Sequence, residues 1–455
     1  MKKIVASVGL VAIGASGIQT ASAQALGAPD ASKPWSVSAT LRGFYDDNSS
    51  TIPNNVTLPP GVHRDSFGYE VSPSAALAWS VDQTTITLGA LYSFQHYDRI
   101  PLNSTGHNDN TFTFNAGLTH AFNEQISARV SDSFVIGQEP DLLRAGNAFS
   151  TFQRVSGNNI RNYGMLGLDA QLTPEFGLGF GYDNAFYDYK DRGPGLAGAV
   201  VEPSLAGALN RIENRAHIEG TWQAMPETKA LIGYQFTDVD YNANELIGGT
   251  LVDPATGLPV LDANGNLTVF NPVMSRDRNS REHTGYVGAE HNFTPEFKGA
   301  LRVGASYTEY PNDKSVSSSW TPYVNGTLRY NYAPQSYVEG GVSYDRNATD
   351  VVGAGLPNTT TLDAESAVVY LSVNHAITPQ LFASLLGQFQ NSSYHGGTFD
   401  GNDEQYYLLG LNLEYRFNQY FSAHVGYNYD RLESSSALNR TFDRNRVYVG
   451  VTATY

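Results

Sequence analysis

The chain has 455 residues, a formal net charge of -16 and no cysteine. The acidic balance argues against nucleic acid as a partner, because that polyanion is bound through clustered Lys and Arg. The lack of cysteine excludes a fold held by disulfides. No linker, charge block or shift in composition interrupts the chain after residue 34, which favours one large domain.

The N-terminus has the layout of an export signal. Two lysines precede a short apolar stretch, and Ala21-Ser22-Ala23 forms a small-residue cleavage site. We therefore expect a signal peptide over residues 1–23, cleavage between Ala23 and Gln24, and a short periplasmic segment over residues 24–34. The alternative is an uncleaved N-terminal anchor, although the apolar stretch is too short to span a bilayer as a helix.

Residues 35–455 show long segments of period-two alternation. Such segments exceed the usual length of strands in soluble proteins and match the length that a tilted strand needs to cross a bilayer. The mean hydropathy of -0.30 excludes a helical membrane protein. It does not exclude barrel strands, in which lipid-facing and lumen-facing residues alternate. The pattern predicts an all-β fold, a transmembrane antiparallel up-and-down β-barrel over residues 35–455.

A short turn motif, often containing proline, recurs between these segments and predicts eight tight turns. Nine longer polar segments alternate with the turns, and they match the long extracellular loops of such barrels. They lie near residues 46–66, 98–109, 139–160, 190–212, 242–279, 311–318, 350–362, 396–403 and 435–441. Eight turns and nine loops predict about eighteen strands with both termini on the periplasmic side. Sixteen is the alternative, because residues 139–212 are the least regular.

One segment fits the alternation badly. In Gln125–Gln138, strict alternation places Asp132 on the lipid side, between Val130 and Phe134. We expect either that a β-bulge turns Asp132 inward or that the register is different there.

The C-terminal segment alternates up to a terminal aromatic residue through Val451, Ala453 and Tyr455. It resembles the closing strand by which the barrel-assembly machinery recognises its clients. We therefore expect that machinery as a partner and the cell outer membrane as the location. There the chain contacts lipid and lipopolysaccharide, and homo-oligomerisation is left open.

Charged residues of both signs fall on the side of the strands that alternation turns inward, and we expect them to line a water-filled pore. The alternative is that they pair across strands and only brace the wall. The expected pore-lining residues are Arg42, Asp46, Arg129, Glu219, Glu290, Arg302, Arg329, Glu339, Glu414, Arg416, Asp430, Arg444 and Arg446. Five of these form an expected cluster beside the closing seam, which is either a ring that selects solutes or a solvated rim. They are Arg42, Asp46, Asp430, Arg444 and Arg446.

Signals for other chemistry are weak. The run that begins at Asp262 is similar to a calcium loop, but its glycine stands at the wrong offset, so a hairpin turn is favoured. His120, His291 and His375 each precede a turn and are interpreted as interfacial polar residues. The chain contains no G-x-S-x-G element. We expect no catalytic residue, no metal site and no cofactor. In general porins the third loop narrows the pore, which here would be residues 139–160.

Tyr69–Trp79 and Leu88–Tyr97 resemble the putative β-barrel porin 2 family. The resemblance implies an outer-membrane barrel and brings no catalytic residues with it. A passive channel for small hydrophilic solutes is the leading hypothesis. Some members of the family occur with exopolysaccharide export systems, which implies a sugar port as the alternative, and the expected lumen-facing Tyr163, Tyr187, Tyr323 and Tyr406 favour it. A non-conducting structural or adhesive barrel is the third hypothesis.

Overall fold

The computed structural model describes residues 33–101, 106–137, 159–197, 200–253, 255–264, 266–313, 318–353, 360–435 and 437–455. Eighteen antiparallel strands form one sheet, and the first strand pairs with the last, so the sheet closes into a barrel. The expected fold and strand count are confirmed, and the alternative of sixteen strands is not. The barrel strands are β1 (Trp35–Asp46), β2 (Ser66–Val81), β3 (Thr84–Tyr97), β4 (Asn108–Ala121), β5 (Ile126–Gly137), β6 (Asn159–Gln171), β7 (Phe176–Tyr189), β10 (Arg211–Met225), β11 (Thr228–Asp240), β14 (Ser280–Asn292), β15 (Phe297–Glu309), β16 (Ser319–Ala333), β17 (Ser336–Asn347), β18 (Asp363–Ala376), β19 (Leu381–His395), β20 (Asp403–Arg416), β21 (Phe421–Ser434) and β22 (Phe442–Thr454).

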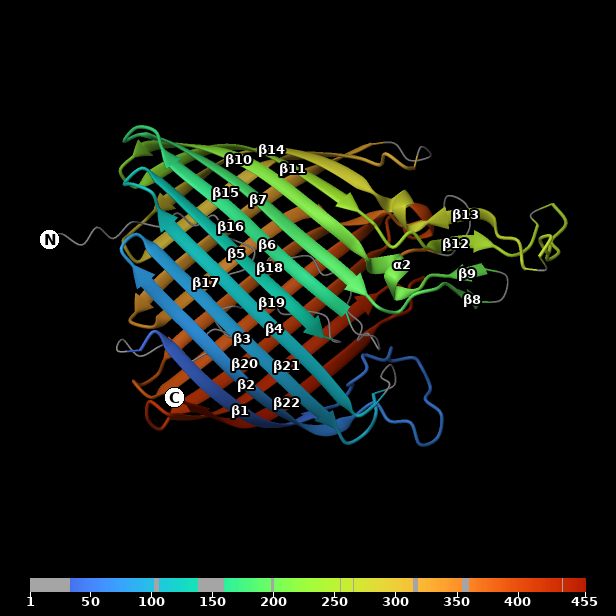
Figure 1. Cartoon of the computed structure of the whole chain (residues 1–455), viewed down its shortest axis with the longest axis horizontal. Helices are drawn as coiled ribbons and strands as arrows, with labels where there is room; N and C mark the ends of the chain where they lie inside the picture. The colour runs from blue at the N-terminus through green and yellow to red at the C-terminus, as the bar shows by residue number, and fades with distance from the viewer. Residues whose placement is uncertain are drawn as a thin grey trace.

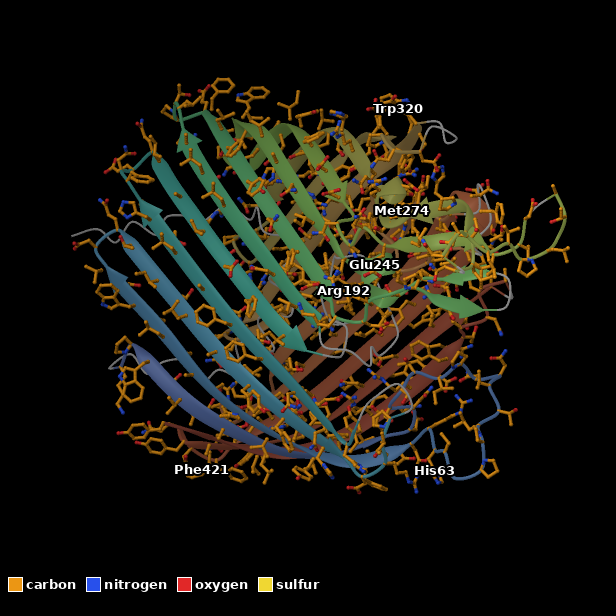
Figure 2. All side chains as sticks on the ribbon, turned by 45° about the vertical axis from the view of Figure 1, so that its right-hand side comes forward. His63, Arg192, Glu245, Met274, Trp320 and Phe421 are labelled. Atoms are coloured by element: carbon orange, nitrogen blue, oxygen red, sulfur yellow. The ribbon has the colours of Figure 1, made fainter. Side chains whose placement is uncertain are left out.

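The strands run obliquely around the barrel (Figure 1), as closure of a sheet requires. Alternate side chains on each strand point outward, and these are mostly apolar. On β22, for example, Val447, Val449 and Val451 are exposed on the outside. Figure 2 shows Trp320 and Phe421 on the outside of the wall at two different parts of the barrel. The intervening positions face inward and are largely polar.

Consecutive strands are joined by eight short turns at one end of the barrel and by longer connections at the other (Figure 1). The expected turns are found where the sequence predicted them. Two of them place a non-glycine residue at positive φ, namely Asp82 at 50° and Gln335 at 59°, a conformation that tight reversals require. Residues 139–158 of the expected third loop lie outside the described residues, as do residues 1–32 with the expected cleavage site.

The barrel closes between β1 and β22. Their pairing runs from Ser38 opposite Thr454 to Asp46 opposite Arg446. Val37 donates a backbone hydrogen bond to Tyr455 at 3.0 Å and accepts one at 2.8 Å. The ring of Tyr455 lies 5.9 Å from that of Trp35. The alternating C-terminus is therefore the closing strand, while its recognition by the assembly machinery stays a prediction.

The expectation for Asp132 was wrong. The pairing of β5 with both neighbours is regular, with Asp132 opposite Ala116 on β4 and opposite Gly164 on β6, so no bulge turns its side chain inward. Asp132 lies on the outward face, where it accepts a hydrogen bond from Asn162 at 2.6 Å. A polar neighbour on the same face, rather than a change of register, accommodates the carboxylate.

The pairing of β16 with β17 ends early at the long-loop end. It stops at Val324 opposite Tyr344, three residues before β17 ends at Asn347. At this end of the barrel, all the remaining ladders between the described strands extend to within one residue of the end of one of their two strands. Extrapolation of the register places Pro322 opposite Arg346. Proline has no N–H to donate and is disfavoured inside a sheet, so it is a local reason for the opening.

Small elements occupy the long connections. Four short strands form a second sheet that projects beyond the barrel (Figure 1). The strands are β8 (Gly195–Ala197), β9 (Val200–Glu202), β12 (Leu246–Thr250) and β13 (Phe270–Met274), and the helical turns are α2 (Leu205–Leu209), η1 (Ser275–Arg278) and η2 (Gly397–Phe399). Within the described residues, none of the helices has the length and apolar character needed to cross a membrane.

Candidate functional site: the lumen and its mouth

All thirteen residues that the sequence nominated for the pore lie at inward positions of the register. They come from β1, β5, β10, β14, β15, β16, β17, β20, β21 and β22. The structure pairs each of them with another inward group. These pairs determine which charges on the inner wall are neutralised by their neighbours.

The cluster expected at the closing seam consists of three separate pairs. Arg42 donates to Glu70 on β2 at 3.0 Å rather than joining the other four residues. Arg446 donates to Asp46 at 2.8 Å, and Arg444 lies 2.7 Å from Asp430. The carboxylate of Asp46 has no exposed surface. Each arginine here has a carboxylate on an adjacent strand, and the pair of Arg446 with Asp46 is the one that crosses the closing seam, whereas the other two tie β1 to β2 and β22 to β21.

A second network crosses the wall from β10 to β15. Arg302 donates two hydrogen bonds to Glu219, at 2.8 and 3.0 Å, although β11 and β14 lie between their strands. Tyr286 donates to the same carboxylate at 3.0 Å, and Arg302 also reaches Glu290 at 3.3 Å. Side chains can meet over two intervening strands only on the concave face of the barrel. A Cβ at Gly233 would lie 2.2 Å from the Tyr286 ring, so glycine leaves the room for this ring to lie flat on the wall.

The remaining nominated residues form shorter-range pairs. Arg129 lies 3.0 Å from Asp169 on β6, and Arg329 donates to Glu339 on β17 at 2.9 Å. Arg416 pairs with Glu414 of its own strand at 3.2 Å and stacks on a phenylalanine ring. Both expectations for these charges therefore have a physical basis, because the groups face the lumen and also brace the wall.

Aromatic side chains occupy two parts of the inner face. The rings of Tyr163 and Tyr187 meet edge to face at 5.8 Å, and those of Tyr286 and Tyr323 are tilted at 5.6 Å. Tyr406 belongs instead to a buried apolar cluster with Leu408, Leu432 and Phe442. The four tyrosines that the sequence singled out therefore do not form one continuous track.

At the long-loop end, the connection between β17 and β18 is the centre of a set of contacts. We call its residues 348–353 the mouth segment. Arg278 of η1 is fully buried and donates to the carbonyl oxygens of Thr349 at 2.6 Å and Val351 at 3.2 Å. It also donates to Ala208 of α2 at 2.9 Å. Burial lowers the pKa of Arg278, and no carboxylate among the described residues forms an ion pair with it. One guanidinium thus ties three connections together through backbone oxygens.

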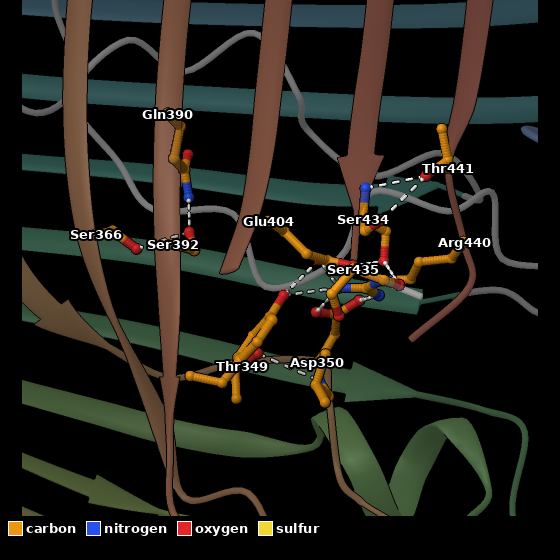
Figure 3. A network of polar contacts seen from close by, with 12 residues as sticks. Thr349, Asp350, Ser366, Gln390, Ser392, Glu404, Ser434, Ser435, Arg440 and Thr441 are labelled. Atoms are coloured by element: carbon orange, nitrogen blue, oxygen red, sulfur yellow. Dashed lines mark hydrogen bonds and ion pairs between the residues drawn. The ribbon is translucent and has the colours of Figure 1, made fainter. Parts of the chain in front are cut away.

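The mouth segment is held from its other side by Asp350 (Figure 3). Arg440, in the connection between β21 and β22, donates to Asp350 at 2.6 Å, to Glu404 of β20 at 2.5 Å and to the Tyr394 hydroxyl at 2.9 Å. Burial raises the pKa of Asp350, although Arg440 acts in the opposite direction. For Arg440 burial alone would lower the pKa, but the two carboxylates raise it well above its usual value.

Apolar packing follows the same arrangement. Val351 packs with Ala364 and Tyr394 on the barrel wall, whereas Val352 packs with Leu209 of α2 and Ile247 of β12. Consecutive residues of the mouth segment are therefore anchored to different parts of the barrel rim. Sequence reasoning gave weight to the third loop and missed this segment. Its signal is Val351-Val352, two adjacent β-branched apolar residues in the connection between β17 and β18.

The nominated histidines each contact a hydroxyl group. His120 and His291 lie 2.8 Å from the hydroxyl groups of Thr84 and Thr228 on neighbouring strands, and His375 lies 2.8 Å from the Tyr332 hydroxyl, two strands away. No group of three or more His, Cys, Asp or Glu side chains suited to a metal ion occurs in the described part of the chain. The Asp262 run forms a turn, in which the Asp262 carboxylate accepts from the Asn264 and Asn266 amides.

Apolar side chains outside and paired charges inside coexist on a closed sheet only where hydrocarbon surrounds the wall. The chain is therefore an outer-membrane β-barrel of the porin type. It belongs to the putative beta-barrel porin 2 family, whose model matches residues 223–455, just over half of the chain. Family and fold together place it in the outer membrane.

Three solved structures illustrate what the fold is similar to. The outer membrane protein opdK from Pseudomonas aeruginosa has 11% identity and a TM-score of 0.41, with 92% of this chain and 99% of that chain covered. A BenF-like porin from Pseudomonas fluorescens Pf-5 has 12% identity and a TM-score of 0.43, with the same coverage. OccAB4 from Acinetobacter baumannii has 13% identity and a TM-score of 0.41, with 94% and 100% covered. No curated protein matches the chain.

Proposed function

We propose that the barrel is a passive channel for small hydrophilic solutes. The observation that carries the proposal is the inner wall, on which buried and half-buried ion pairs from all sides of the barrel replace the apolar packing of a solid core. A sheet of eighteen strands is too wide for side chains to fill by packing alone. Charges that already have partners neutralise each other, so they hydrate a path without trapping an ion on it.

The mouth segment is the proposed constriction. It is the part of the described chain that contacts the barrel rim on several sides, through Arg278, Arg440 and the two valines. A short, doubly anchored segment restricts the size of a solute without requiring a separate plug domain.

Conductance of the purified protein in planar bilayers tests the channel and its constriction together. We expect steady open steps from the native protein and larger or noisier steps from Arg440→Gln, because the variant loses the ion pair with Asp350 at the mouth. Arg281→Gln is the matched control, since its guanidinium pairs with Asp238 on the outward face of the wall. Silence from a folded native barrel contradicts a channel and supports a structural or adhesive role.

A sugar port is the second candidate, and the ring pairs on the inner face favour it. Tyr163 with Tyr187, and Tyr286 with Tyr323, present aromatic faces of the kind that stack on sugar rings. Addition of neutral oligosaccharides in the same bilayer distinguishes the two candidates. Brief, concentration-dependent blockades by one oligosaccharide class support the port, and unchanged steps support a general channel.

A further inference from the structure

Two neighbouring strands of the barrel have an inner face without charge. The inward positions of β18 and β19 hold no Asp, Glu, Lys, Arg or His, and among the described barrel strands this is the one adjacent pair for which that holds. Asp363 and Glu365 of β18 lie at the alternate positions near the rim, where they pair with Arg346. Hydroxyl and amide side chains occupy many of the inward positions instead. We call them the uncharged strip, which consists of Ser366, Ser372, Ser384, Gln388, Gln390 and Ser392.

The register brings the members of the uncharged strip onto one surface. Ser366 lies opposite Ser392, and their hydroxyl oxygens are 3.0 Å apart. Gln390 donates to the Ser392 hydroxyl at 2.9 Å, so these three residues form a short chain near the long-loop end (Figure 3). The remaining members follow on the same face toward the turns. Ser384, at that end, is only partly buried, so the strip reaches the open lumen there.

The two glutamines have hydrogen-bonding capacity that the wall does not use. Their side chains point inward and are 5% exposed for Gln388 and 1% exposed for Gln390. Both polar atoms of the Gln388 amide and the amide oxygen of Gln390 make no hydrogen bond to any described residue. A buried amide in a native wall requires partners for its donor and its acceptor. Because the wall does not supply them, they have to come from the lumen, as water or as a dissolved solute.

The wall between β10 and β15 shows the contrast. There the inward groups are charged and bind one another, as Arg302 does with Glu219 and Glu290. Hydrogen bonds between charged groups are strong, so an uncharged solute gains little by competing with them. Amides and hydroxyls both donate and accept, and they exchange a water molecule for a solute hydroxyl at little cost. The two walls therefore suit different kinds of solute.

We propose that the uncharged strip binds uncharged, polyhydroxylated solutes such as sugars and polyols. A hydroxyl group of the solute accepts from the Gln388 amide nitrogen and donates to the amide oxygen of Gln388 or Gln390. A solute with several hydroxyl groups reaches several members of the strip at once. The inference rests on the proposed channel and deepens it, because it names the class of solute. It also places the path of that solute along β18 and β19 rather than along the ion-paired wall.

Binding to the purified full-length barrel in detergent tests the strip without requiring conductance. Isothermal titration calorimetry with maltotriose, cellotriose and raffinose compares the native protein with the double variant Gln388→Leu/Gln390→Leu. Leucine replaces unsatisfied polar groups by an apolar side chain, so the double variant should still assemble. The matched control is Gln235→Leu, a glutamine at an inward position of β11, opposite His217.

We expect at least one of the three sugars to bind the native barrel. The double variant should weaken that binding about tenfold, and the control should change it by less than about twofold. Absence of binding of all three sugars to the native barrel overturns the proposal, and so does an equal loss in the double variant and the control. Unchanged affinity in the double variant also overturns it, because the amides then bond water only.

Two further probes on the native protein test the chemistry even if a variant fails to assemble. Trigalacturonate resembles the sugars in size but carries charges, and a polyethylene glycol of similar mass has ether acceptors along its chain. Both should bind at least about tenfold more weakly than the best neutral sugar, and equal binding of either contradicts the proposal. A silent barrel that binds sugars contradicts the channel alone, whereas a conducting barrel that binds none contradicts the strip alone.

Discussion

Two seams of this barrel are held together in different ways. Between β1 and β22 the backbone ladder continues to Asp46 opposite Arg446, and side-chain pairs are added to it. Between β16 and β17 the ladder ends at Val324, and above that point side chains connect the two strands. The first seam would remain a sheet without its ion pair, whereas the second has no backbone pairing beyond Val324.

Arg346 is the residue that spans the open seam. It donates to Thr321 on β16 at 2.7 Å, to the Tyr310 hydroxyl at 2.9 Å and to Asp363 on β18 at 2.9 Å. Its side chain is 3% exposed and also pairs with Glu365. The difference between the seams shows that one buried arginine with several hydrogen-bond partners can connect two strands where their backbone hydrogen bonds are missing.

The open seam adjoins the mouth. The outer end of β17 is free of β16 but stays paired with β18 up to Asn347 opposite Ala364. The chain leaves β17 directly into the mouth segment and turns across the rim toward Arg278.

Arg346→Ala is the change with the largest expected effect. Removing one partner of a buried ion pair leaves carboxylates uncompensated and costs about 3–5 kcal/mol. We expect a lower urea midpoint of the folded barrel in lipid vesicles. Arg416→Ala, whose guanidinium is 38% exposed, is the control and should cost about 1 kcal/mol or less. Equal losses would mean that the open seam is not specially dependent on its cation.

Arg278→Met should come next. The variant keeps an unbranched apolar stem but loses three bonds to the backbone oxygens of the mouth and α2, at about 1.5–3 kcal/mol for a bond to a charged group before relaxation. We expect local loosening, measured as faster amide exchange in residues 348–353, with unchanged protection of β1 and β22. Protection lost evenly around the barrel would contradict a local role.

Thr321→Val compares the two seams with one matched substitution. Thr321 accepts twice from Arg346 and donates to Glu365, so its loss at the open seam should cost about 1–3 kcal/mol. Thr40→Val removes the Thr40–Thr452 contact at the closing seam, where the ladder persists, and should cost about 0.5–1 kcal/mol. The comparison fails if Thr40→Val is the more damaging change in parallel urea titrations.

Asp350→Asn should have the smallest effect, and its sign depends on pH. Burial raises the pKa of Asp350, so the folded state favours the protonated carboxyl. Its contribution to stability is greatest at low pH and is lost as pH rises through the raised pKa. The native protein should therefore gain stability relative to Asp350→Asn as pH falls, which urea midpoints at neutral and acidic pH measure. A relative gain at high pH would refute this.

Much of the architecture could be predicted from the sequence, because period two and turn residues act locally. Turns such as Pro334–Gln335 and the alternation on β20 and β22 follow from neighbouring residues alone. The strand count followed from these turns, and the inward positions of residues such as Arg42 and Glu219 followed from parity.

Partners over long distances could not be predicted in the same way. Arg302 meets Glu219 over two strands because the wall is curved, and Arg278 meets Thr349 because two connections turn toward each other. The alternation of residues along one strand predicts neither the curvature of the wall nor the direction of a loop. Asp132 shows a further reason, since its polar neighbour Asn162 lies on the next strand, where a one-dimensional pattern cannot detect it.

The four-stranded sheet of β8, β9, β12 and β13 extends past the rim (Figure 1). Outer-membrane barrels direct their long connections to the cell exterior, so we expect this sheet to be the portion that an antibody or a bacteriophage tail meets first. Its hairpin between β12 and β13 makes few ties to the rim, so a foreign peptide inserted near residues 255–264 would be displayed at the cell surface while the wall below kept its shape.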